Sequence, residues 1–186
     1  PARHRVRGQA RRLMRVRRFQ KWQSTRPLGA VSLISLLFMA QLVACLAIIW
    51  LLPVFPTQDV PAHLYSAHVL IDLAREAIWD IDSLYADYYR VAWRFVPNWL
   101  GTSLLVMFGF LLPLPVVEKL LISVALIVFC TGFACLLWRG REDAPVVLLA
   151  VPAFGWGFWL HMGFYNYSLG LALLPWGWLF MAQLLE

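Results

Sequence analysis

The feature that most constrains this chain is a long uncharged stretch, Leu28–Leu52, that directly follows a strongly basic segment. At about 1.5 Å of rise per residue, a helix over this stretch is longer than the roughly 30 Å hydrocarbon core of a bilayer. The stretch is too long for the apolar core of a cleaved signal peptide. We therefore predict a transmembrane helix here.

The composition of the whole chain agrees with this prediction. Of the 186 residues, 61% are hydrophobic and 14% are charged, whereas a soluble domain has about 45–50% apolar and about 25% charged residues. A water-soluble globule is effectively excluded. The chain begins with Pro1 and ends at Glu186 directly after an apolar run, so we expect a fragment of a longer protein.

The net charge of +6 is concentrated at one end of the chain. Residues 1–26 contain ten Lys and Arg and no acidic residue. By the positive-inside rule, residues 1–27 form a basic cytoplasmic tail, and the first span emerges on the outer face of the cytoplasmic membrane. A nucleic-acid-binding arm and an organelle transit peptide are the alternatives. The direct continuation into an apolar stretch favours the tail, and we expect no nucleic-acid partner.

Further apolar runs predict a multi-pass protein. Three of them are predicted to be spans: Val116–Trp138, Pro145–His161 and Phe164–Leu185. A fourth run, Trp99–Leu112, is shorter than the roughly 17–25 residues that a span needs. The expected fold is an all-α integral membrane protein: residues 28–186 form a polytopic helical bundle of four spans, with one short interfacial or re-entrant helix.

The short run leaves two topologies open. If Trp99–Leu112 lies in the interface or re-enters, Arg139 and Arg141 face the cytoplasm and the Gly163–Tyr167 turn faces outside. If it spans, Glu118 and Lys119 are cytoplasmic and the loop containing Arg139 is outside. The first arrangement obeys the positive-inside rule better, and we prefer it.

The outside loop, residues 53–98, is the only substantial polar region after the tail. Asp59 followed by Pro61 is a helix-start signal. Apolar residues then recur at helical spacing: Val60, Leu64, Ala67, Ile71, Ala74 and Ile78. This pattern predicts an amphipathic juxtamembrane helix that lies on the bilayer with its apolar stripe toward the lipid.

Asp59 and His63 are four residues apart and therefore share one face of this helix. Asp59 also lies where the chain leaves the membrane, which suits a carboxylate that meets a lipid headgroup. The simpler interpretation is a helix cap at Asp59 and a solvated His63. Both residues can also ligate a metal, but two ligands do not define a site.

Other polar residues are weaker candidates. Asp80 and Asp82 form a D-x-D pattern, which can hold a divalent cation or is simply a solvated acidic turn. Arg90 and Arg94 could bind a phosphate, because guanidinium matches it bidentately, or could reach toward lipid headgroups. Asn166 lies between two apolar runs, where it either lines a cavity or ends a helix.

Several segments resemble a known group of proteins. The chain contains FPTQDVPAHLYSAHVL at Phe55–Leu70, RFVPNWLGTSLL at Arg94–Leu105, VEKLL at Val117–Leu121 and MGFYNYSLGLAL at Met162–Leu173. These blocks are similar to those of bacterial multi-span proteins of the GT-C superfamily of glycosyltransferases. The resemblance covers most of the chain beyond the basic tail, and its sharpest part is the Q-D-x-P-A-H-L-Y block.

The resemblance implies an enzyme that transfers a sugar from a polyprenyl-phosphate donor. Asp59 matches the acidic residue that such proteins carry soon after the first span, where it deprotonates the acceptor or helps to hold a divalent metal. His63 would orient the reacting groups, and Arg90 or Arg94 would meet the phosphate. The pattern's second carboxylate has no clear match, although Asp80 and Asp82 are candidates. The alternatives are a transporter or flippase and a non-catalytic membrane assembly protein.

Overall fold

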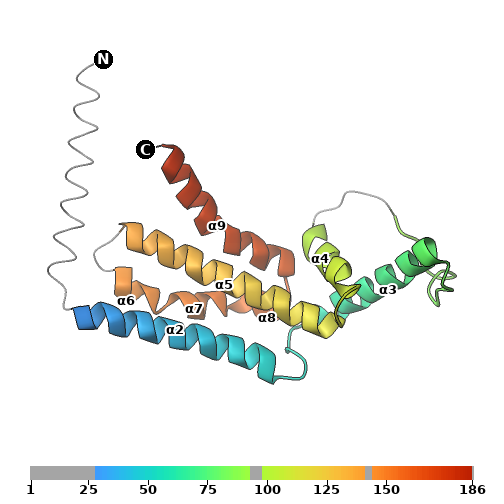
Figure 1. The fold of residues 1–186 in the computed structure, drawn as a ribbon, viewed down its shortest axis with the longest axis horizontal. Helices are drawn as coiled ribbons and strands as arrows, with labels where there is room; N and C mark the ends of the chain where they lie inside the picture. Colours follow the sequence, from blue (N-terminus) through green and yellow to red (C-terminus); the bar gives the residue numbers. More distant parts are fainter. Residues whose placement is uncertain (1–27, 93–97, 141–143, 186) are drawn as a thin grey trace, which may run out of the picture.

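The computed structural model describes residues 28–92, 98–140 and 144–185, and over these residues the chain is helical with turns and no strand. This agrees with the predicted all-α class. The basic tail, Arg94 and Arg141 lie outside the described residues. Figure 1 shows long rows of helix side by side, with α3 (Val60–Trp79) and α4 (Trp99–Gly109) projecting from one end.

Two helices are long and apolar enough to cross a membrane, by length and composition: α2 (Leu28–Leu51), over its part Leu33–Leu51, and α5 (Leu114–Gly140), over Leu114–Arg139. They contact each other and run in opposite directions (Figure 1). Both coincide closely with predicted spans. Each sequence is uncharged through its middle, as a bilayer core requires.

The predicted span at Pro145–His161 is not one continuous helix. It is divided into α6 (Ala144–Leu148), α7 (Val151–Gly155) and α8 (Phe158–Met162). Gly157 separates the last two with an extended backbone, and a Cβ there would lie 2.8 Å from the carbonyl oxygen of Phe154. The three pieces nevertheless follow one another in a row between α2 and α5 (Figure 1).

The last helix, α9 (Tyr165–Leu184), packs along α5. The Trp176 indole nitrogen donates a hydrogen bond of 2.9 Å to the Val128 carbonyl oxygen. Gly132 makes this approach possible, because a Cβ there would lie 2.6 Å from the Trp176 indole nitrogen and 2.7 Å from Pro175. Figure 1 shows α9 bending away from α5 in its second half, where Pro175 interrupts the helix.

The polar loop, residues 53–98, contains α3 (Val60–Trp79), which begins where the Asp59 and Pro61 signal predicts. Its apolar stripe differs from the expectation. Val60, Ala67 and Ile71 are buried, and α3 packs on α5 and on the short helix α4 (Trp99–Gly109). This part of the stripe therefore contacts protein rather than lipid, because α4 supplies an apolar partner. Ile78, at the far end, stays 64% exposed.

Several chain segments meet at one end of the long helices, which we call the junction. The Lys119 ammonium, in the second turn of α5, donates a hydrogen bond to the Leu52 carbonyl oxygen just beyond α2. The backbone amide of Gln58 bonds to the His161 carbonyl oxygen at 3.1 Å. The end of α2 and the beginnings of α3, α5 and α9 therefore lie together.

Candidate functional site

Asp59 is fixed at the junction through its backbone. Its amide donates a hydrogen bond of 3.1 Å to the Met162 carbonyl oxygen, next to the equivalent bond from Gln58. Gly163 then turns the chain with a φ of +81°, and a Cβ there would lie 3.2 Å from the amide nitrogens of Asp59 and Val60. Position 163 is therefore restricted to glycine by both its backbone conformation and its close neighbours.

The Asp59 carboxylate is not used as a helix cap. Asp59 occupies the N-cap position of α3, but its side chain makes no capping hydrogen bond. An N-cap aspartate normally accepts a bond from the amides of the first turn. Here the half-buried carboxylate remains available to other groups at the junction. Asp59 therefore occupies the N-cap position that the simpler interpretation expects, but without the side-chain hydrogen bond of a cap.

His63 lies one turn further along α3. Its backbone amide bonds to the Asp59 carbonyl oxygen at 3.1 Å, so the two predicted residues share the first turn of the helix. The His63 imidazole packs against the phenol ring of Tyr165, with ring centroids 5.3 Å apart. Tyr165 is the first residue of α9 and is buried.

Behind Tyr165 is a buried carboxylate that the sequence analysis did not include in the site. Glu118, in the first turns of α5, is 0% exposed. The Tyr165 and Thr57 hydroxyls are buried as well. Neither oxygen of Glu118, nor the hydroxyls of Tyr165 and Thr57, forms a hydrogen bond of good geometry with a described residue. The signal was present in the sequence, because a charge within an apolar run is costly.

Asn166, predicted to contact substrate, forms hydrogen bonds at the beginning of α4. Its amide nitrogen donates to the Asn98 carbonyl oxygen at 2.7 Å, and its amide oxygen accepts from the Gly101 amide at 2.7 Å. These bonds hold the N-terminal turn of α4, whose own N-cap residue makes no side-chain cap. Asn166 thus joins α4 to α9, close to Tyr165 but with its amide already occupied.

The two candidate metal ligands are remote from Asp59. Asp80 ends α3 in a left-handed conformation, and Asp80 and Asp82 are both exposed. The 20 residues of α3 place them about 30 Å from Asp59. Within residues 28–92, 98–140 and 144–185, no three His, Cys, Asp or Glu side chains gather as a metal site would require. The residues present do not fit a metal centre, so no step is assigned to one.

The segment after α3 folds back along that helix. The Ser83 hydroxyl donates a hydrogen bond of 2.6 Å to the Asp72 carboxylate, and the Tyr85 ring contacts Tyr65. The hydroxyls of Tyr65 and Tyr89 are 3.2 Å apart, which raises the pKa of Tyr65 to about 12. Arg90, the residue after Tyr89, is exposed. Because the segment folds back along α3, Arg90 lies toward the N-terminal half of that helix.

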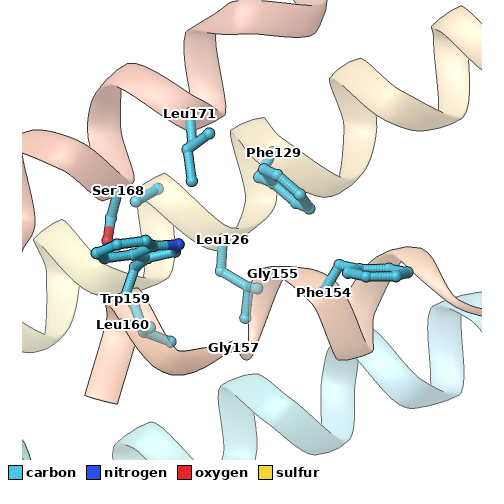
Figure 2. A pocket seen from close by; sticks show the side chains of 10 residues that line it. Leu126, Phe129, Phe154, Gly155, Gly157, Trp159, Leu160, Ser168 and Leu171 are labelled. Atoms are coloured by element: carbon cyan, nitrogen blue, oxygen red, sulfur yellow. The ribbon is translucent and has the colours of Figure 1, made fainter. Parts of the chain in front are cut away.

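A shallow apolar groove lies beside the junction (Figure 2). It runs between α5, the α7–α8 break and α9, and Figure 2 shows Trp159, Leu126 and Phe129 around it. Ser168, one turn of α9 beyond Tyr165, is a polar residue at its edge. The groove therefore begins close to the polar side chains of the junction and continues into apolar surroundings.

Comparisons with protein-family models, with curated proteins and with solved structures find no match for this chain. The class of protein is thus defined by the fold alone. Its described part is all-helical, with two helices of membrane-spanning length and composition and a polar junction at one end of them.

Proposed function

We propose that this chain belongs to a membrane glycosyltransferase. It would transfer a sugar from a polyprenyl-phosphate donor to an acceptor at the outer face of the cytoplasmic membrane. The observation that carries the proposal is the Asp59 carboxylate, which follows α2 at the junction and makes no capping hydrogen bond within the described first turn of α3. The resemblance of the Phe55–Leu70 block to GT-C proteins supports the same conclusion.

The exposed surface of α2 supports a membrane location. Leu36, Val43 and Leu51 are 66%, 58% and 81% exposed. Contiguous apolar surface of this kind is rare on soluble proteins, whereas lipid covers it without cost. With the basic tail inside, the junction would lie at the outer headgroup layer, in a multi-pass protein that both long helices anchor in the lipid bilayer.

The donor's chemistry fits the arrangement of the junction. A polyprenyl chain stays in the bilayer, so its phosphate and anomeric carbon are presented at headgroup depth. Arg90, returned along α3, is available to the phosphate, and Arg94 is proposed for the same role.

Asp59 would act as the general base in this reaction. The acceptor hydroxyl transfers its proton to the Asp59 carboxylate as its oxygen attacks the anomeric carbon, and the bond to the lipid phosphate breaks. His63, in the same turn of α3, would orient the acceptor. Hydrogen bonds from backbone amides stabilise the ionised form of a carboxylate. A carboxylate that made such bonds would therefore be a weaker base toward the acceptor hydroxyl.

The test is lipid-phosphate release by the intact protein. The full-length protein, reconstituted in vesicles, is incubated with a panel of polyprenyl-phosphate sugars, and the freed polyprenyl phosphate is measured with and without acceptor extracts. We expect release from at least one donor, and loss of that release in Asp59→Asn. No release from any donor tried would contradict the proposal.

One observation favours a transporter or flippase as the second candidate. The α6–α8 segment is interrupted, and Glu118 is buried near the beginning of α5. Interrupted helices and buried charges are features of transporters. The two functions are separated by product. A transporter moves the lipid-linked sugar intact, whereas a glycosyltransferase cleaves it. A non-catalytic assembly protein would do neither.

A further inference from the structure

His161 is a side chain at the junction to which the proposed chemistry gives no role. It lies in the short helix α8 and is exposed. Its backbone carbonyl oxygen accepts the 3.1 Å bond from the Gln58 amide, beside the bond that joins Asp59 to Met162. A polar ring is costly in the hydrocarbon core, whereas at the junction it lies in the proposed headgroup layer.

The imidazole ring of His161 is oriented by a hydrogen bond. Its Nδ1 atom lies 3.1 Å from the Gly157 carbonyl oxygen. Because a carbonyl oxygen only accepts, Nδ1 carries the hydrogen and donates it. In the neutral imidazole the other ring nitrogen, Nε2, then has no hydrogen and is a hydrogen-bond acceptor.

The Gly157 carbonyl group does not need this bond. The same oxygen already accepts bonds from the backbone amides of Leu160, at 3.2 Å, and of His161 itself, at 3.4 Å. A carbonyl oxygen has two lone pairs, so these two amides already satisfy it. The main consequence of the bond from the ring is therefore that the imidazole is fixed in one tautomer and one orientation.

Two aromatic side chains pack against the same ring. The ring centroid of His161 lies 5.6 Å from that of Trp156 and 6.0 Å from that of the buried Phe55. Phe55 belongs to the segment that leads to Asp59, so the imidazole contacts the segment that its backbone also binds. An acceptor beside aromatic rings suits a ligand with both apolar faces and hydrogen-bond donors.

The acceptor character of Nε2 selects the ligand. The phosphate oxygens of a polyprenyl-phosphate sugar are acceptors as well, so they do not match this nitrogen. A sugar hydroxyl donates and does match it, and the C–H faces of a sugar ring are apolar enough to lie against aromatic side chains.

We propose that His161 binds the sugar of the lipid-linked donor, with Nε2 accepting a hydrogen bond from a sugar hydroxyl. The inference rests on the proposed function for the kind of ligand that reaches the junction. Binding at His161, however, is measured without any glycosyl transfer.

The experiment measures how fast His161 reacts with diethyl pyrocarbonate in the full-length protein reconstituted in vesicles. Each modified histidine is identified by peptide mass spectrometry. The reagent acylates an unprotonated ring nitrogen, so it reports on Nε2. His68, which is exposed on α3, is the internal reference. The probes are bare polyprenyl phosphate and the panel of polyprenyl-phosphate sugars used in the transfer assay.

We expect at least one polyprenyl-phosphate sugar to slow His161 modification by about threefold or more once its concentration exceeds its Kd, because the bound ligand covers the nitrogen. His68 modification should not change, and bare polyprenyl phosphate should not protect His161. Equal protection by the bare lipid would assign the contact to the phosphate and overturn the proposal. Absence of protection by every sugar lipid in the panel would overturn it as well.

A pair of substitutions separates binding from structure. His161→Asn keeps an amide near the position of Nδ1, which can still donate to Gly157, but it has no group at the position of Nε2. His161→Gln places its amide near the position of Nε2 instead. His68→Asn is the matched control, because it changes another exposed histidine in the same way.

The readout is the rise in unfolding midpoint that the protecting lipid produces in detergent. His161→Asn should weaken the affinity for this lipid by about tenfold, the scale of one lost hydrogen bond, and so lose most of the rise. His161→Gln should recover part of it, and His68→Asn should keep all of it. An unchanged rise in His161→Asn would contradict the proposal. If that variant does not fold, the protection experiment decides.

Failure of this inference and failure of the proposed function are distinguishable. If Asp59→Asn still transfers sugar, the catalytic role of Asp59 fails, while protection of His161 by the sugar lipid still supports the binding role. If transfer depends on Asp59 but His161 is never protected, only the inference about His161 fails.

Discussion

Asp59 and Met162, far apart in the chain, are joined by a backbone hydrogen bond of 3.1 Å from the Asp59 amide to the Met162 carbonyl oxygen. This bond places the first residue of the candidate site against the turn that precedes α9. The position of the Asp59 carboxylate is therefore determined by two segments of the chain, the loop after α2 and the α8–α9 turn, rather than by α3 alone.

Gly163→Ala should disturb this arrangement. Alanine at a φ of +81° costs about 1–2 kcal/mol, and its Cβ would lie 3.2 Å from the amide nitrogens of Asp59 and Val60. We expect a lower midpoint of thermal unfolding and weaker transfer activity. The measurement is thermal unfolding of the detergent-solubilised protein, followed by assay of lipid-phosphate release.

The matched control for that substitution is Gly170→Ala. Gly170 lies in α9, and a Cβ added there would have no other atom within 4 Å. Alanine also favours a helix interior over glycine by about 0.5–1 kcal/mol. Gly170→Ala should therefore keep or raise the unfolding midpoint. Equal losses of stability in both variants would contradict the role assigned to the Gly163 turn.

Asn166→Ala should release the beginning of α4. The substitution removes two hydrogen bonds of 2.7 Å and leaves the Gly101 amide without its partner. Loss of such a buried partner costs about 1–3 kcal/mol. Hydrogen exchange should quicken at the first turn of α4, whereas the surface control Ser66→Ala, which loses only a bond to its own helix, should leave that exchange as it is.

The junction predicts the topology of α5. Gln58 lies at the junction, and Gly140 is the last residue of α5, at its opposite end. After the free cysteines Cys45, Cys130 and Cys135 are replaced, Gln58→Cys should react with an impermeant thiol reagent from outside the cell. Gly140→Cys should react only after permeabilisation. Labelling of both positions from the same side would show that α5 does not cross the membrane.

Local signals were sufficient to predict part of this fold. The uncharged run after the basic tail predicted α2, and the Asp59 and Pro61 pair predicted the first turn of α3. Both depend on residues close together in the chain. The proximity of Asp59 and His63 followed in the same way, because residues four apart share a helix face.

Features that depend on packing between distant segments could not be predicted. The apolar stripe of α3 fits a lipid surface as well as it fits α4, and only the fold shows that Val60 and Ala67 contact protein. Likewise, the sequence marks Glu118 as a costly charge, but its complete burial depends on the packing of α5 against other helices. The break at Gly157 was hidden within a uniformly apolar run.

The most direct test of the central claim compares Asp59→Asn with Asp80→Asn for both stability and lipid-phosphate release. Because the Asp59 carboxylate makes no capping bond, Asp59→Asn should unfold at the same temperature as the wild-type protein. Its transfer activity should fall by at least about a hundredfold, the scale of a lost general base. Asp80→Asn, at the far end of α3, should remain active. Full activity of Asp59→Asn would contradict a catalytic role for this carboxylate.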